Sequence, residues 1–113
     1  MSSIDVEGLK RLSGDDEEFV TDILKLYTER TESDLFDLQE AKREENWNQV
    51  RFIVHRMRSS AVPLGLKDLV VQLRKVEDKL KKEEIEGVSG ELDVIIEKSG
   101  EALLDARKRL EIV

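Results

Sequence analysis

Apolar residues recur at helical spacing along almost the whole chain, and Pro63 is its only proline. The spacing is clearest in residues 47–61. At about 100° per residue, their apolar side chains fall in one stripe roughly 120° wide, as in an amphipathic helix that faces a core. The stripe consists of Trp47, Val50, Ile53, Val54, Met57 and Ala61. Aromatic residues make up only 4% of the chain, which suits helices better than sheets, so we predict an all-α fold.

Two further helices are predicted before this segment. The short first one has the apolar residues Ile4, Leu9 and Leu12. It should end at Ser13-Gly14, where a hydroxyl and a flexible residue meet. The acidic run 15–18 then places negative charge at the amino end of a long helix, which should extend to about Glu45. The apolar face of this long helix consists of Phe19, Ile23, Leu26, Tyr27, Leu35 and Leu38.

The helix over residues 47–61 has clear start and stop signals. Asn46 is a good N-cap for a helix that begins at Trp47, and Pro63 with Gly65 should end or bend it and reverse the chain. The next helix repeats the apolar pattern in Leu66, Leu69, Val70, Leu73, Val76 and Leu80.

A break is expected before the last helix. It should lie near Gly87, Ser89 and Gly90. The last helix has the apolar residues Leu92, Ile95, Ile96, Leu103, Ala106 and Leu110. Four amphipathic helices with short connections predict an antiparallel up-and-down four-helix bundle with a short additional N-terminal helix. The length of 113 residues suits a single domain over residues 1–113.

Charge and composition exclude several functions. The formal net charge of -7 disfavours nucleic-acid binding, which usually needs a basic face. No apolar run approaches the roughly 18 residues of a membrane span, and the amino end lacks the pattern of a signal peptide, so we expect a cytoplasmic protein without membrane contact. With one histidine and no cysteine we predict no metal site, and neither a phosphate-binding loop nor a nucleophile elbow occurs.

The single histidine, His55, lies on the polar side of the helix over residues 47–61. The same arithmetic places it roughly 150° from the middle of the apolar stripe. Its neighbours three and four residues away on that surface are Arg51, Phe52, Arg58 and Ser59. We therefore predict an exposed imidazole flanked by cations and hydroxyls. An imidazole has an ordinary pKa of about 6.5, so much of it is neutral and nucleophilic near pH 7.

The run from His55 to Gly65 resembles the signature of histidine-containing phosphotransfer (HPt) domains, roughly His-x-Leu/Met-Lys-Gly-Ser-x-x-x-Leu-Gly. The residues in register are Met57, Ser60, Leu64 and Gly65. The resemblance extends to Trp47 and Val50 before the histidine and to Leu69, Leu73, Val76 and Glu77 after it, and covers about Phe19 to Lys81. Arg58 stands where the family usually has lysine, Ser59 where it has glycine, and Pro63 is a milder departure.

The resemblance implies a phosphorelay function. His55 would accept a phosphoryl group from a phosphoaspartate of a response-regulator receiver domain and pass it to another receiver aspartate. Arg58, together with the hydroxyl of Ser59 or Ser60, would hold the phosphoryl oxygens. The domain would need no cofactor of its own, because Mg²⁺ would come with the receiver. It would be a phosphocarrier rather than a turnover enzyme, either free-standing or the terminal domain of a hybrid histidine kinase, which would act in cis or in trans.

A docking surface for the receiver is also predicted around His55. Arg51, Arg56 and Arg58 form a basic island in an acidic chain, and Phe52 and Val62 are apolar residues on the outward side. The resemblance adds Glu77 and Lys81, which occupy positions that approach the histidine in family members.

Other interpretations of these residues stay open. Arg51 and Arg56 are also explained by ordinary surface ion pairs, Phe52 by burial beneath the leading helix, and Ser60 by a bond to a carbonyl one turn back. For the whole domain, the alternative is a degenerate HPt-like helical interaction domain that docks a receiver without efficient phosphotransfer, with Arg58 and Ser59 as the cause.

Overall fold

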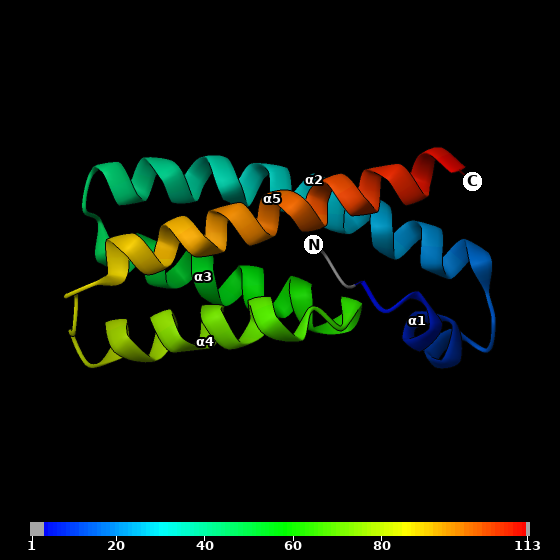
Figure 1. The fold of residues 1–113 in the computed structure, drawn as a ribbon, viewed down its shortest axis with the longest axis horizontal. Helices are drawn as coiled ribbons and strands as arrows, with labels where there is room; N and C mark the ends of the chain where they lie inside the picture. Colours follow the sequence, from blue (N-terminus) through cyan, green and yellow to red (C-terminus); the bar gives the residue numbers. More distant parts are fainter. Residues whose placement is uncertain (1–3, 113) are drawn as a thin grey trace.

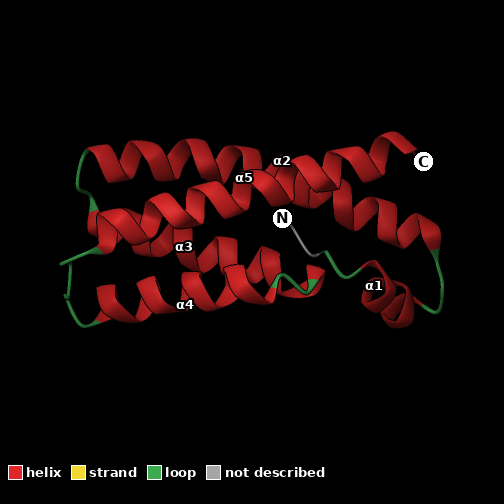
Figure 2. Cartoon of the chain, in the orientation of Figure 1, coloured by secondary structure: helices red, strands yellow, loops and turns green. Residues whose placement is uncertain are grey.

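The computed structural model describes residues 4–112, which form helices joined by short connections and contain no strand (Figure 2). The elements are α1 (Val6–Ser13), α2 (Glu17–Arg43), α3 (Trp47–Ala61), the short 3₁₀ helix η1 (Val62–Leu64), α4 (Lys67–Lys81) and α5 (Val88–Ile112). The prediction of an all-α fold is confirmed.

The four long helices form an elongated bundle of 43 × 21 × 21 Å (Figure 1). Each of them packs against two neighbours, because α2 contacts α3 and α5, and α4 also contacts α3 and α5. Successive helices reverse direction at the ends of the bundle, as an up-and-down topology requires. The short helix α1 lies at one end and packs against α2 and η1. The predicted bundle with an additional N-terminal helix is therefore confirmed.

The core follows the apolar stripes of the sequence. From the stripe over residues 47–61, Val50, Ile53, Val54, Met57 and Ala61 are buried. Trp47 is half-buried and packs against the same core. The side chains that meet this stripe from the other long helices include Leu24, Leu38, Leu73, Val76, Leu92 and Ile95. Burial of one apolar face on every helix fixes which face of α3 is left for solvent.

Local polar signals begin and end α3. The side chain of Asn46 accepts a hydrogen bond from the backbone N–H of Gln49 at 3.2 Å, so it caps the helix as predicted. At the other end, Pro63 lies in the 3₁₀ turn η1, and Gly65 follows with a φ of +67°. The left-handed conformation of Gly65 lets the chain reverse into α4.

Several details differ from the sequence prediction. The last helix begins at Val88, so Ser89 and Gly90 lie in its first turn rather than in a break. Val88 is fully buried, and Gly87, with a φ of +78°, directly precedes it at the end of the connection from α4. In the first helix Leu12 is 75% exposed, whereas Ile4 is buried although it precedes the helix.

Candidate functional site

His55 lies just past the middle of α3, on the side that faces α4. Its side chain is 57% exposed. Together with residues of α3 and α4 it lines an open groove of about 540 Å³. The other residues that line this groove are Asn48, Arg51, Phe52, Glu77 and Lys81. The packing of α3 against α4 thus surrounds an exposed imidazole with charged side chains.

Glu77 of α4 connects the charged groups of the site. Only 3% of Glu77 is exposed, and both of its carboxylate oxygens have partners within the protein. One oxygen, Oε2, lies 2.6 Å from Nδ1 of His55 and 3.7 Å from Nζ of Lys81. The other, Oε1, accepts a 2.9 Å hydrogen bond from Nε of Arg58. This one buried carboxylate therefore fixes both the imidazole and the guanidinium.

Opposing effects act on the pKa of Glu77. Burial raises this pKa, but the hydrogen bond to His55, the positive charge of Arg58, the charge of His55 and the hydrogen bond from Arg58 lower it by more. The net result is a pKa below the ordinary value, so Glu77 is ionised near neutral pH. An ionised carboxylate can only accept hydrogen bonds, so the 2.6 Å contact assigns the proton to Nδ1 of His55.

This proton assignment leaves Nε2 of the neutral imidazole with its lone pair free. Among the residues that the structure describes, none makes a hydrogen bond to Nε2. The terminal nitrogen of Arg58 lies 3.3 Å from Nδ1, a longer contact than the one to Glu77. The arrangement presents a single exposed nucleophilic nitrogen on a ring whose orientation is fixed from behind.

A comparison with protein families shows which family contains such a chain. The model of the Hpt domain matches residues 22–111, which include His55, all of its contacts and most of the bundle. The chain belongs to the Hpt domain family. Hpt domains carry out histidine phosphotransfer in phosphorelays and work with response-regulator receiver domains. No curated protein and no solved structure matches the chain significantly.

Two features do not occur in the part of this Hpt domain that the structure describes. Residues 4–112 contain no group of three or more histidine, cysteine, aspartate or glutamate side chains placed to hold a metal ion. None of the described helices is both long enough and apolar enough to span a bilayer.

The two serines of the Hpt signature lie on different sides of α3. The hydroxyl of Ser59 donates to the carbonyl of His55, and that of Ser60 donates to the carbonyl of Arg56, each at 3.3 Å. Both therefore bond one turn back, as proposed above for Ser60 alone. Ser59 is exposed one turn from the imidazole, whereas Ser60 is half-buried toward α2. The structure brings Ser59, but not Ser60, to the face of His55.

Arg56 is held by α2. Its Nε lies 2.8 Å from Oδ1 of the buried Asp34, and its terminal nitrogen lies 2.7 Å from the same oxygen and 3.6 Å from Asp37. The guanidinium carbon also lies 5.6 Å from the centre of the Phe52 ring, a cation–π distance. Phe52 itself is 62% exposed, so α1 does not cover it.

The other residues predicted for docking lie around the groove or beyond it. Arg51 is exposed on the groove and has no ion-pair partner among the described residues. Lys81 stands on the α4 side of the groove. Val62 is 54% exposed in η1, past the end of α3.

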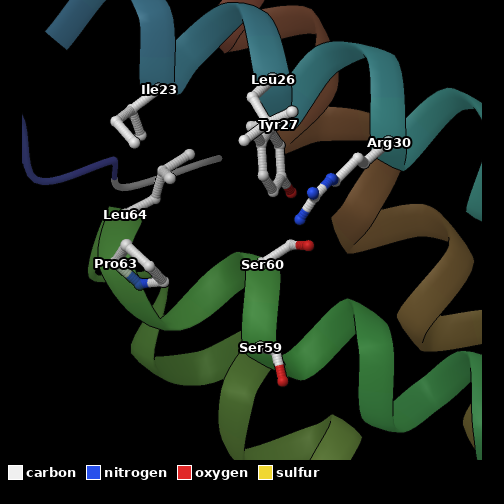
Figure 3. A pocket seen from close by; sticks show the side chains of 8 residues that line it. All are labelled: Ile23, Leu26, Tyr27, Arg30, Ser59, Ser60, Pro63 and Leu64. Atoms are coloured by element: carbon white, nitrogen blue, oxygen red, sulfur yellow. The ribbon is translucent and has the colours of Figure 1, made fainter. Parts of the chain in front are cut away.

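A small hollow of about 100 Å³ lies on the α2 side of α3, and Arg30 is the one residue lining it that the sequence analysis did not name (Figure 3). Four come from α2, namely Ile23, Leu26, Tyr27 and Arg30, and they face Ser59, Ser60, Pro63 and Leu64. In Figure 3 the guanidinium of Arg30 reaches toward Ser60, and the side chain of Ser59 points away from the hollow. Leu26 belongs to the predicted apolar face of α2, but it is 41% exposed, and Phe19 of the same predicted face is 38% exposed. Leu26 and Arg30 are four residues apart on α2 and therefore share one helical face. This spacing is the only feature of the sequence that could have pointed to the hollow.

Proposed function

We propose that this Hpt domain accepts a phosphoryl group on Nε2 of His55 from the phosphoaspartate of a receiver domain and returns it to the aspartate of another receiver. The observation that carries the proposal is the 2.6 Å contact between Nδ1 of His55 and the ionised Glu77. It leaves Nε2, in an exposed ring of an Hpt domain, as the nitrogen that can attack phosphorus.

The transfer needs few groups from this chain. The lone pair of Nε2 forms a bond to phosphorus while the bond from phosphorus to the aspartate oxygen breaks, and the aspartate leaves as a carboxylate. The ring gains positive charge in this step, and the negative Glu77 at 2.6 Å stabilises it. The receiver supplies Mg²⁺ and the acidic pocket, so the domain itself requires no cofactor.

We assign the cations of the site two different roles. Arg58 is mostly buried and holds Glu77 through its Nε, so it acts first as a positioning residue for the carboxylate. Arg51 and Lys81, which line the groove, are placed to attract the phosphoryl oxygens and the acidic rim of a receiver. Ser59, one turn from His55, is a further candidate donor to a phosphoryl oxygen, because its hydroxyl can rotate away from the carbonyl.

The docking surface in this proposal combines apolar contact with charge. Phe52 and Val62 present exposed apolar side chains on the two sides of His55 along α3 and η1. Arg56 contributes through Phe52, which its guanidinium supports from the α2 side. The receivers that dock here would belong to response regulators or to a hybrid histidine kinase, either in cis or in trans.

The test is transfer of labelled phosphate from a phosphorylated receiver with Mg²⁺ to the wild-type domain and to His55→Gln. We expect acid-labile label on the wild type within minutes and none on the variant, with equal helical content by circular dichroism. Label on His55→Gln would refute the site assignment. If several receivers bind the wild type but none labels it, the domain docks without transfer, and Ser59→Gly tests whether the added hydroxymethyl group is the obstacle.

A further inference from the structure

We infer that Glu77 also controls the release of the phosphoryl group, because it holds a proton on Nδ1 of phosphorylated His55 and so keeps the ring a good leaving group. This inference rests on the proposed phosphorylation of Nε2. It concerns the second half of the relay, in which the domain must give up the phosphoryl group that it has accepted.

The balance of the release step shows why the proton on Nδ1 matters. In phosphorylated His55 the ring is a cation while Nδ1 keeps its proton. When the bond from Nε2 to phosphorus breaks, its electron pair returns to Nε2, and a carboxylate oxygen of the receiver aspartate forms the new bond to phosphorus. The ring then leaves as neutral imidazole with Nδ1 still protonated. If Nδ1 had lost its proton, the leaving group would be an imidazolate anion, which is far more basic and leaves far more slowly.

The cationic side chains around the ring favour loss of the proton on Nδ1, and Glu77 opposes this loss. From α3, Arg51 lines the same groove, and Arg58 has a nitrogen 3.3 Å from Nδ1. From α4, Lys81 lines the groove as well. These three cations disfavour a positive ring. Among residues 4–112, no charged side chain of α2 or α5 contacts His55. Glu77 is therefore the single anion that the described chain places against the ring.

Glu77 is well placed to outweigh those cations. Its Oε2 is in direct hydrogen-bond contact with Nδ1 at 2.6 Å, whereas Lys81 is joined to the ring only through Glu77. The carboxylate is almost fully buried, so water screens its attraction for the N–H group weakly. Arg58 occupies the other oxygen and keeps Oε2 directed at the ring.

Two substitutions on α4 separate this role from a structural one. Glu77→Gln preserves size and a hydrogen-bond acceptor but removes the charge. Asp78→Asn is the matched control, because it removes the same charge from an exposed neighbour that makes no contact with His55. His55 is first phosphorylated with phosphoramidate, so that loading does not depend on a receiver. Single-turnover transfer from each phosphorylated domain to a receiver with Mg²⁺ is then measured at several pH values.

The expected result is a loss of transfer that depends on pH. The rate for Glu77→Gln relative to wild type should fall by about tenfold or more between about pH 6 and about pH 9, and the ratio for Asp78→Asn should stay constant. The pH dependence of the receiver cancels in both ratios. In parallel, ¹⁵N NMR of the phosphorylated imidazole should show Nδ1 protonated at alkaline pH in the wild type and deprotonated in Glu77→Gln.

The possible failures are distinguishable. If Glu77→Gln transfers at a constant fraction of the wild-type rate at every pH and its Nδ1 keeps the proton, the inference is wrong while the proposed function stands. If neither phosphoramidate nor any phosphorylated receiver labels His55, the proposed function fails, and the inference fails with it.

Discussion

Gly65→Ala adds only one methyl group in a loop, but it should destabilise the domain far more than such a substitution usually does. Gly65 has a φ of +67°, and a Cβ atom there would lie 2.7 Å from Cβ of Asp5. Asp5 cannot easily move, because its backbone N–H donates to the carbonyl of Leu64 at 2.8 Å and its side chain caps α1. The left-handed conformation costs alanine about 1–2 kcal/mol, and the overpacking adds about 1–3 kcal/mol.

Gly14→Ala is the matched control for this prediction. Gly14 has nearly the same φ, +68°, but nothing lies within 4 Å of a Cβ atom built on it. The free energy of unfolding of Gly14→Ala should therefore fall only by the conformational cost, about 1–2 kcal/mol. Urea unfolding followed by far-ultraviolet circular dichroism measures both free energies, with equal m-values as the sign that the unfolded states are comparable. Equal losses for the two variants would refute the steric part of the reasoning.

A second substitution makes the test sharper. Asp5→Gly in the Gly65→Ala background removes the Cβ atom that the new methyl group would meet. Glycine is a tolerated N-cap, which costs only a few tenths of a kcal/mol relative to aspartate. The double variant should therefore regain about 1 kcal/mol or more over Gly65→Ala. If it is less stable still, the two positions are not in steric conflict.

Two further predictions concern buried carboxylates. Arg56→Ala should lower the free energy of unfolding by about 2 kcal/mol, and Asp34→Ala should lower it by less, because only the first leaves a buried carboxylate without its partner. Urea unfolding of the two variants measures the order, and the reverse order would contradict the prediction. For Glu77, a lowered pKa in the folded state means that its ionised form adds stability above the ordinary pKa of about 4.3 and loses this contribution as the pH falls through the folded value. The stability difference between wild type and Glu77→Gln should thus shrink in acid, and an unchanged difference between about pH 6 and about pH 3 would contradict this.

The fold could be predicted from the sequence because its signals are local. The spacing of Val50, Ile53, Val54 and Met57 alone determines which side of α3 is buried. The start of α5 depends on tertiary contacts and was therefore missed. Lys79 of α4 holds that start, since its Nζ contacts the carbonyl of Glu86 at 2.9 Å and the side chain of Glu91 at 2.5 Å. No local pattern reports such a contact across a connection.

The same distinction applies to the site. The position of His55 opposite the apolar stripe follows from helical geometry within one segment. Its contact with Glu77 joins residues that are 22 positions apart on different helices, as does the contact of Arg56 with Asp34. Periodicity on one helix cannot select such partners, and only the resemblance to HPt domains pointed to Glu77. Arg30 had no signal of that kind, because it belongs to the hollow only through the packing of α2 on α3.

The burial of Glu77 is the feature of this site that most needs a functional reason. A buried carboxylate is costly to the fold, and an apolar residue of similar size would pack between α3 and α4 at a lower cost. Here both oxygens are engaged, one with the imidazole and one with Arg58, so the charge is kept where it acts on a single ring nitrogen. In the proposed relay His55 accepts and releases the same phosphoryl group, and the proton on Nδ1 would assist both steps, because it leaves Nε2 free to attack and lets the ring depart neutral. Under this proposal one residue on α4 would serve both directions of transfer, and this double role would be the functional reason for its burial.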